Sequence, residues 1–342
     1  MSQIPPIDAP RSAVQGEAER VDINLGHACN HKCVFCMQSE SGIEQKKWVS
    51  LDKLREELRF YAEQKGVRSL GLLGGEPTLY PWLEEGLIFA GELGYNDITI
   101  NTNGFRLGQW EFASMAAERG IRRYCLSIHS EDPAVEDFLS GQKGAFVRKM
   151  RAIRNLTKLK ASGMRDLTIS INAVLNKKNL PTLDRFVKFF KHLGIVDIRF
   201  NFIRPEGRAA GRKDIVCTFS EAMPKLMELV ALNGREWKIR LSFGEIPYCV
   251  YRSDFFKIEP LRRAYIGEYV DRRTFVSTFG NTPGPLSDND GHQRFIWQDL
   301  KMNKLKSFVS ACTSCAWREV CGGVWTNYLE MYGDKEFRTL TE

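Results

Sequence analysis

Short runs of β-branched and other apolar residues alternate along this chain with longer amphipathic segments. The short runs predict strands at 21–25, 69–73, 98–101, 124–128, 167–174 and 196–202. Helical periodicity predicts helices at 51–65, 82–93, 109–119, 146–162 and 180–192, several of which end just before a glycine. This repeated unit predicts an α/β fold whose parallel sheet is either doubly wound or curled into a barrel.

Residues capable of chemistry follow four of the predicted strands at the point where each strand ends. The first strand is followed by cysteines, the second by Gly74, Gly75 and Glu76, the third by Asn103, and the fourth by His129. Because the carboxyl ends of parallel strands meet at one edge of a sheet, we expect these residues to share a site.

The pattern changes beyond Gly234, where the strand–helix alternation gives way to irregular sequence and a cysteine-containing tail. We therefore expect three parts: a flexible N-terminal segment over 1–20, a barrel domain over 21–234, and a C-terminal extension over 235–342. Proline, glycine and aspartate crowd the stretch 281–292, which predicts a mobile loop.

Composition narrows the class of protein. The chain has 342 residues and a net charge of +7 spread along its length, so nucleic-acid binding is not indicated. It has neither a signal sequence nor an apolar run of membrane-spanning length, and a cytoplasmic location is expected. Nine cysteines in clusters form an awkward set of disulfides but a natural set of metal ligands in a reducing compartment.

The first cysteine cluster has the spacing C-x3-C-x2-C and comprises Cys29, Cys33 and Cys36. Three thiolates on a four-iron cluster leave one iron open to a small ligand, which makes that iron reactive. Structural zinc is the alternative. His27 and His31 lie nearby but lack the usual spacing of paired histidine ligands.

These cysteines, with aromatic Phe35 before the last of them, resemble the signature of the radical S-adenosylmethionine (SAM) superfamily. The resemblance implies a partial six-stranded TIM-like barrel and a 4Fe–4S cluster whose open iron binds SAM. Reduction of that cluster would cleave SAM to methionine and a 5′-deoxyadenosyl radical. Gly74, Gly75 and Glu76 resemble the family's GGE motif, which holds the methionyl amine.

The same resemblance implies further contacts to SAM. Asn103, Ser127 and His129 lie where the family contacts the ribose and carboxylate, although a plain turn at Asn103 would also explain that residue. Phe35 and the backbone of Met37 would flank the adenine. From the strand pattern, Asn172 and Asn201 either face the same cavity or form a structural hydrogen bond inside the barrel.

A second cysteine cluster, C-x2-C-x5-C, lies near the end of the chain and comprises Cys312, Cys315 and Cys321. We expect Cys249 to be its fourth ligand, with Cys217 as the rival. Closed tetrahedral zinc is the alternative to iron. The spacing resembles SPASM and twitch extensions, which implies an auxiliary 4Fe–4S cluster and two clusters in all. The C-x3-C continuation of full SPASM domains is absent here.

Cys217 has three possible roles: a core residue, a cluster ligand, or a thiol that donates hydrogen to a substrate radical. Arginines after the sixth strand could clamp an anion, or simply form a solvated basic loop. Only about twenty residues precede the first predicted strand, which gives little room for a module that grasps a leader peptide.

We expect an enzyme that abstracts hydrogen from a peptide or small natural-product precursor, with the auxiliary cluster transferring an electron. Flavodoxin or ferredoxin is the expected electron donor. RNA modification is a second possibility, although no RNA-binding domain is recognisable. A non-enzymatic electron carrier is a third, which the GGE turn disfavours because a carrier needs no SAM pocket.

Overall fold

The computed structural model of the chain describes residues 18–37, 48–267, 273–279 and 292–341. Residues 1–17 of the predicted flexible segment lie outside the described part, as do residues 281–291 of the predicted loop. None of the described helices is long and apolar enough to cross a membrane.

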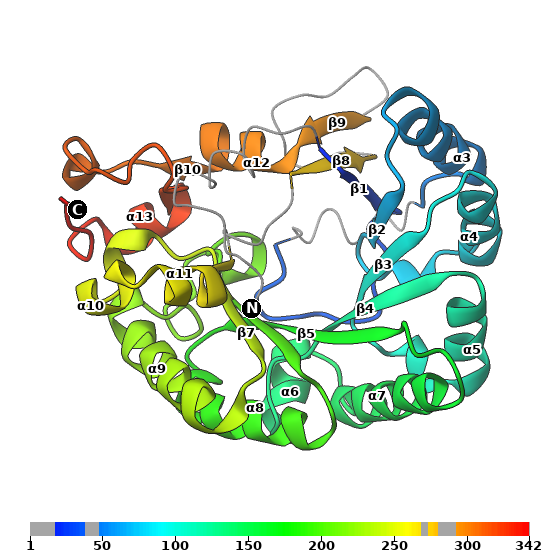
Figure 1. Cartoon of the computed structure of the whole chain (residues 1–342), viewed down its shortest axis with the longest axis horizontal. Coiled ribbons are helices and arrows are strands. Elements are labelled where there is room, and N and C mark those ends of the chain that lie inside the picture. Colours follow the sequence, from blue (N-terminus) through cyan, green and yellow to red (C-terminus); the bar gives the residue numbers. More distant parts are fainter. Residues whose placement is uncertain (1–17, 38–47, 268–272, 280–291, 342) are drawn as a thin grey trace.

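A single nine-stranded sheet in the order β7-β6-β5-β4-β3-β2-β1-β8-β9 forms the centre of the molecule (Figure 1). All neighbouring strands are parallel except β8 and β9, which are antiparallel, and the sheet is not closed. The strands are β1 (Arg20–Asn24), β2 (Ser69–Leu73), β3 (Asp97–Thr102), β4 (Ile121–Ser127), β5 (Thr168–Leu175), β6 (Asp197–Phe202), β7 (Arg240–Gly244), β8 (Thr274–Thr278) and β9 (Gln293–Ile296).

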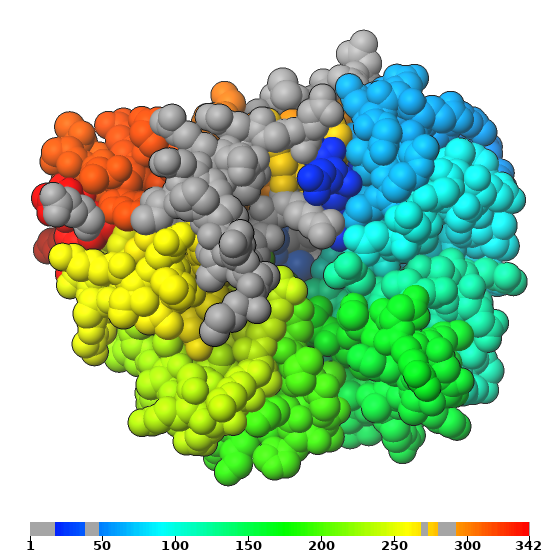
Figure 2. All heavy atoms as spheres, in the orientation of Figure 1, coloured from blue at the N-terminus to red at the C-terminus, as the bar shows by residue number. Residues whose placement is uncertain are grey.

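Helices cover the outer side of the curved sheet, and the C-terminal residues gather at one side of the molecule (Figures 1 and 2). The barrel helices are α3 (Leu51–Arg59), α4 (Leu83–Glu92), α5 (Trp110–Glu118), α6 (Pro133–Ser140), α7 (Ala145–Ala161), α8 (Leu183–His192) and α9 (Phe219–Leu232). Later helices are α10 (Ser253–Lys257), α11 (Glu259–Tyr265), α12 (Trp297–Leu300) and α13 (Thr326–Tyr332), and a short ribbon pairs β10 (Lys306–Ser307) with β11 (Val324–Trp325).

The two faces of the sheet differ in polarity because side chains alternate along each strand. Leu70 and Leu72 of β2 are buried and line the same small apolar space as leucines of α3 and α4. Side chains on the opposite face are polar. On β1, Nε of Arg20 donates to the Asp22 carboxylate at 2.7 Å, and Nη1 of Arg20 donates to the hydroxyl of Thr99 on β3 at 3.0 Å. The sheet therefore has an apolar outer face and a polar inner face.

The predicted α/β fold with a parallel sheet is confirmed, and all six predicted strands and five predicted helices are present. The sequence analysis missed β7, β8 and β9, which join the same sheet, so the sheet extends across the boundary predicted at Gly234. It also missed α6, although Asp132 caps its first turn and Gly141 ends it in the left-handed conformation.

A buried carboxylate attaches the last strands to the first barrel helix. Glu57 of α3 accepts hydrogen bonds from the Ser277 hydroxyl at 2.9 Å and from Nε of Arg294 at 3.0 Å. Burial alone would raise the pKa of Glu57, but hydrogen bonds from His292 and Arg294 outweigh it and lower the pKa to about 2. Glu57 therefore stabilises the β8–β9 edge of the sheet as an anion.

Replacing Glu57 by Gln is expected to lower the free energy of unfolding at pH 7 by about 2 kcal/mol, because an amide accepts weaker bonds from Arg294 than a carboxylate does. The folded pKa lies below the unfolded value of about 4.3, so this stabilisation is complete above that pH and is lost as the pH falls toward 2. Urea denaturation at pH 7 and pH 2.5 measures both effects.

Glu56→Gln is the matched control for this prediction, since the neighbouring Glu56 side chain is 61% exposed and should contribute little. If the free energies of unfolding of wild type and Glu57→Gln differ by the same amount at both pH values, the ionic explanation is contradicted.

Candidate functional site

The loop after β1 carries the first cysteine cluster. Burial raises the pKa of Cys29 to about 11, and the nearby Cys36 thiol contributes to the rise. Burial raises the pKa of Cys33 to about 12, again with contributions from the other two thiols. The three sulfur atoms are thus close enough to influence one another, as the predicted ligand set requires.

The Gly74-Gly75-Glu76 turn packs against the backbone of this cysteine loop. The N–H of Gly75 donates to the carbonyl of Gly26 at 2.8 Å, and the N–H of Glu76 donates to the carbonyl of Ala28 at 2.9 Å. A Cβ atom on Gly75 would lie 2.4 Å from the Ala28 carbonyl oxygen, and Gly74 has a φ of +147°. In this structure the two glycines allow the turn to approach the cysteine loop.

The Glu76 carboxylate is buried and already surrounded by donors from the protein. It accepts hydrogen bonds from the Thr78 hydroxyl at 2.6 Å, the Thr102 hydroxyl at 2.5 Å and the Asn103 N–H at 2.7 Å. Burial raises the pKa of Glu76, and these hydrogen bonds oppose the rise. Glu76 therefore joins the end of β2 to the end of β3, a role that the sequence analysis did not foresee.

Asn103 lies beside the cysteine loop. Its Nδ2 donates to Oδ1 of Asn30 at 2.8 Å and lies 4.0 Å from Sγ of Cys29, while its Oδ1 accepts the N–H of Phe105 at 2.9 Å. Asn103 thus both forms a turn and lies close to the first cysteine cluster, so both interpretations offered for it from the sequence agree with the structure. The N–H of His31 also approaches Sγ of Cys29, at 3.4 Å.

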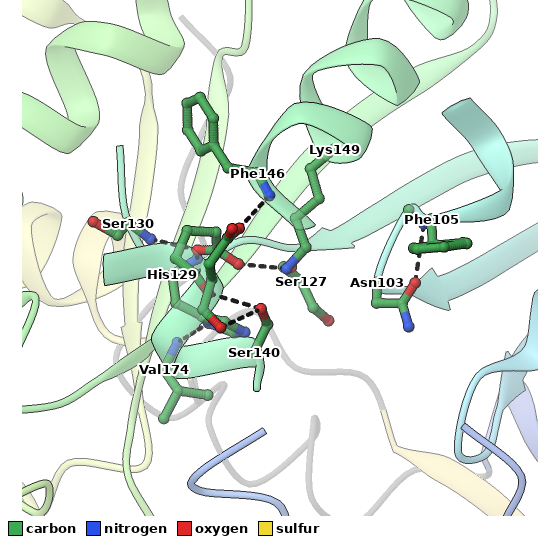
Figure 3. Close-up of polar contacts among 12 residues, drawn as sticks. Asn103, Phe105, Ser127, His129, Ser130, Ser140, Phe146, Lys149 and Val174 are labelled. Atoms are coloured by element: carbon green, nitrogen blue, oxygen red, sulfur yellow. Dashed lines mark hydrogen bonds and ion pairs between the residues drawn. The ribbon is translucent and has the colours of Figure 1, made fainter. Parts of the chain in front are cut away.

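Ser127 ends β4, and His129 follows it (Figure 3). Nδ1 of His129 accepts the N–H of Val174 at 3.1 Å, and burial lowers the pKa of His129 to about 4, so the ring is neutral. The ring of Phe35 meets that of His129 edge-on, with 4.7 Å between their centroids. The carbonyl of Ser127 accepts a hydrogen bond from Nζ of Lys149 at 2.7 Å.

Two further predicted residues contact each other inside the sheet. Nδ2 of Asn201 donates to Oδ1 of Asn172 at 2.7 Å, and Oδ1 of Asn201 accepts from Nε of Arg199 at 2.9 Å. Asn172 and Asn201 therefore lie side by side, as a common cavity would require. They also form the structural hydrogen bond that the sequence analysis gave as the alternative to a shared cavity.

The loop after β6 holds the far end of the cysteine loop. The N–H of Arg208 donates to the carbonyl of Cys36 at 2.9 Å. A Cβ atom on Gly207 would lie 2.4 Å from that carbonyl and 2.6 Å from the carbonyl of Met37. The side chain of Met37 is 55% exposed, so its backbone, rather than its side chain, is held here.

Cys249 lies near the second cysteine cluster, although the two are far apart in the sequence. Burial raises the pKa of Cys249 to about 11, and the thiols of Cys312 and Cys321 contribute to the rise. Burial raises the pKa of Cys321, and the backbone of Tyr248 and of Gly323 opposes the rise by hydrogen bonding to the thiol. Cys315 lies in the same turn, where its N–H donates to the carbonyl of Cys312 at 3.3 Å.

Cys217 lies elsewhere. It is fully buried, burial raises its pKa to about 12, and its charged neighbours are Glu221, Lys177 and Glu336 rather than other cysteines. The surroundings of Cys217 resemble those of an ordinary core thiol. They favour Cys249 over Cys217 as the fourth cysteine of the second group.

All nine cysteines are free thiols. In the described part of the chain, no three His, Cys, Asp or Glu side chains converge closely enough to hold a single metal ion. A 4Fe–4S cluster is bound at separate iron corners, so its thiolates lie further apart than the ligands of one zinc ion. Both cysteine groups, with backbone hydrogen bonds to a sulfur in each, fit such a cluster.

Charged residues connect the second cysteine group to the carboxyl edge of the sheet. Glu245, which follows β7 with a φ of +66°, forms ion pairs with Lys301 at 3.1 Å and Lys306 at 2.8 Å. Lys306 and Arg204 each lie 4.6 Å from the ring centroid of Trp325. Arg204, one of the arginines after the sixth strand that could clamp an anion, forms an ion pair with Glu206 in its own loop.

Sequence reasoning also missed a buried ion pair between Glu136 of α6 and Lys149 of α7, directly behind the end of β4. The signal that could have revealed it was Asp132-Pro133, which is typical of a helix start and would have put Glu136 on a helix.

Comparisons with known proteins agree with this geometry. Residues 23–198 match the sequence profile of the family described as Radical SAM superfamily. A protein of Sulfolobus acidocaldarius described as "Probable GTP 3',8-cyclase" is 30% identical over 192 residues, which cover 56% of this chain and 58% of that protein. A protein of Metallosphaera sedula with the same description is 29% identical over 222 residues, covering 65% of this chain and 66% of its own length. The chain thus spans little more than half of the first relative.

Solved structures share the fold over nearly the whole chain. Streptococcus suis SuiB bound to S-adenosylmethionine superposes with a TM-score of 0.65 at 19% identity, covering 95% of this chain and 76% of SuiB. Native anSMEcpe with bound AdoMet and Cp18Cys peptide superposes with a TM-score of 0.63 at 18% identity, covering 94% of this chain and 92% of that one.

Gly75→Ala should lose most of the iron of the first cluster, because the added Cβ would push the turn away from the Ala28 carbonyl and loosen the cysteine loop. Iron per chain after anaerobic reconstitution measures the effect. Gly91→Ala is the matched control, since a Cβ at Gly91 of α4 meets nothing within 4 Å. Full iron in Gly75→Ala would show that the close packing of the two loops is dispensable.

Proposed function

Because the chain belongs to the Radical SAM superfamily and is therefore an enzyme, we propose that it abstracts hydrogen from a peptide or a small natural-product precursor and uses an auxiliary cluster to remove an electron from the product radical. Family membership implies a 4Fe–4S cluster and SAM. The auxiliary cluster, the substrate and the residue roles are the proposal.

The first cluster would be held by Cys29, Cys33 and Cys36. When bound, this group supplies the electron that cleaves SAM and so generates the radical that takes hydrogen from the substrate. The chain's own residues hold the cysteine loop from several sides and exclude water with the rings of Phe35 and His129. Asn103, close to Sγ of Cys29, is well situated to contact the ligand of the open iron.

The influence of the Cys312 and Cys321 thiols on Cys249, whose pKa they help to raise, is the observation that supports the proposal. Four thiols would ligate a second cluster completely, so that cluster would have no open iron for substrate. Electron transfer is then its most economical role. The ion pairs of Glu245 with Lys301 and Lys306 attach this region to the carboxyl edge of the sheet, near the first site.

A peptide substrate is supported by the shared fold alone, since Streptococcus suis SuiB is described with a bound precursor peptide and anSMEcpe with a bound Cp18Cys peptide. All nine cysteines are free, which supports the proposal of a reducing, cytoplasmic location. A flavodoxin or ferredoxin would supply the electron to the first cluster.

A nucleotide substrate is the second candidate, because the archaeal relatives are described as GTP 3',8-cyclases. These matches cover only part of either protein. Measuring 5′-deoxyadenosine formation with GTP, and separately with candidate precursor peptides, would distinguish the two: the true substrate should accelerate SAM cleavage.

The reconstituted protein is expected to bind about eight irons, and replacing Cys29, Cys33 and Cys36 together by Ala should leave about four. Iron and zinc per chain are measured after anaerobic reconstitution. Zinc in the remaining site would contradict an auxiliary iron–sulfur cluster, and full retention of iron would contradict the first site.

Replacing Cys312 and Cys315 by Ala should preserve substrate-dependent formation of 5′-deoxyadenosine but abolish the final product, because hydrogen abstraction precedes the loss of the electron. Both compounds are quantified by liquid chromatography of the same reaction. Cys217→Ala is the control and should yield normal product. Normal product from the Cys312/Cys315 variant would rule out electron transfer, whereas loss of product in the control would make Cys217 the hydrogen donor.

A further inference from the structure

Helix α7 carries a row of positive charges on the outer side of the sheet (Figure 1). Its 17 residues include six lysines and arginines and no acidic residue. Lys149 points inward, where it donates to the carbonyl of Ser127 at 2.7 Å (Figure 3). The other five are exposed, and four of them recur every three or four residues and so share one face of the helix. We call these four the basic stripe: Arg148, Arg151, Arg154 and Lys158.

The charges of the basic stripe are not compensated by acidic neighbours. Within the described part of the chain, none of the four side chains forms an ion pair. Exposed cations elsewhere do have such partners, as Lys53 has Glu56 at 3.0 Å and Arg119 has Glu84 at 2.9 Å. Like charges three or four residues apart on a helix repel one another. The stripe therefore suits a partner that brings negative charge.

The N-terminal end of the stripe reaches the first cysteine loop through direct contacts. Cζ of Arg148 lies 4.0 Å from the ring centroid of Phe105, and that ring meets the ring of His31 edge-on, with 6.0 Å between their centroids. The backbone N–H of His31 in turn approaches Sγ of Cys29 at 3.4 Å. Three contacts thus connect an exposed arginine with a proposed ligand of the first cluster.

The turn that precedes α7 touches the same loop. The N–H of Lys32 donates to the carbonyl of Ser140 at 3.0 Å, and Gly141 packs so tightly against the carbonyl of Lys32 that a Cβ atom would not fit there. The side chain of Lys32 is exposed, as is that of Lys143 in this turn. The positive surface therefore continues from α7 onto the cysteine loop itself.

An acidic electron carrier fits this surface better than a nucleic-acid substrate does. A substrate must reach the carboxyl edge of the sheet, where the site residues gather, whereas α7 covers the outer side. An electron carrier needs only to approach the first cluster, because an electron can pass through packed side chains. Opposite charges on two proteins also accelerate their association and orient them.

We propose that the basic stripe, together with Lys32 and Lys143, is the docking surface for a small acidic protein that delivers one electron to the first cluster. The inference rests on the proposed cluster at Cys29, Cys33 and Cys36. One electron leaves the reduced cofactor of the carrier and enters the cluster, while no bond forms or breaks and no proton is transferred.

The test measures formation of 5′-deoxyadenosine from SAM by the full-length reconstituted protein with two reductants. One is a purified flavodoxin with an acidic surface, supplied in its reduced form at increasing concentrations. The other is dithionite, a small reductant that needs no docking surface. Arg148→Gln/Arg151→Gln should raise the flavodoxin concentration that gives half the maximal rate by about tenfold at low salt. The rate with dithionite should stay unchanged.

Two further variants separate charge from packing. Arg151→Glu reverses one charge of the stripe and leaves the contact between Arg148 and Phe105 in place, so it should weaken the flavodoxin-driven reaction alone. Lys188→Gln/Arg235→Gln removes two charges from exposed positions on α8 and after α9 and should leave both rates unchanged. Raising the salt from about 50 to 300 mM should reduce the differences between wild type and the stripe variants, because salt screens exposed charges.

The same flavodoxin dependence in wild type and in Arg151→Glu would overturn the inference, and this variant decides if Arg148→Gln/Arg151→Gln loses activity with both reductants. Weaker binding of a single-stranded RNA oligonucleotide by the stripe variants, with unchanged flavodoxin kinetics, would overturn it in favour of a nucleic-acid surface. Wild-type protein that cleaves no SAM even with dithionite would overturn the proposed function, and the inference with it.

Discussion

The described part of the cysteine loop after β1, residues 25–37, contains no helix or strand, so its shape depends on backbone hydrogen bonds to neighbouring loops. Gly75 and Glu76 bind it from the end of β2, the end of α6 binds it on either side of Cys33, and Arg208 binds it from the loop after β6. Buried backbone groups must be paired, and here that pairing determines where three thiols point. Every proposed step of the chemistry depends on this arrangement.

The parallel sheet makes this possible because it brings the ends of distant strands to one edge. Its outer face is apolar and packs against helices, whereas its inner face carries hydrogen-bonded polar side chains such as Asn172 and Asn201. Charged groups near the site are compensated within the protein: Glu76 by hydroxyl and N–H donors, Glu136 by Lys149. These charged groups thus have their partners within the protein itself.

The C-terminal segment is attached to this edge by charge as well as by packing. Glu245 binds two lysines from beyond β9, and one of these, Lys306, lies against Trp325 on the ribbon that follows the last cysteines. A change at the carboxyl edge can therefore reach the second cysteine group through a few direct contacts. The electron transfer proposed between the two cysteine groups would need such a connection.

The sequence by itself determined six of the nine strands of the sheet, most barrel helices and the family, because hydrophobic periodicity and cysteine spacing are local properties of the chain. It indicated which residues gather at the carboxyl edge, but not what they contact there. Only the tertiary structure decided that Glu76 is surrounded by Thr78, Thr102 and Asn103 and that Cys249, rather than Cys217, adjoins the C-terminal thiols. It also revealed that Lys149, one of several basic residues on its helix, is paired with Glu136. These contacts join residues far apart in the chain, and their energies depend on burial, which no local pattern specifies.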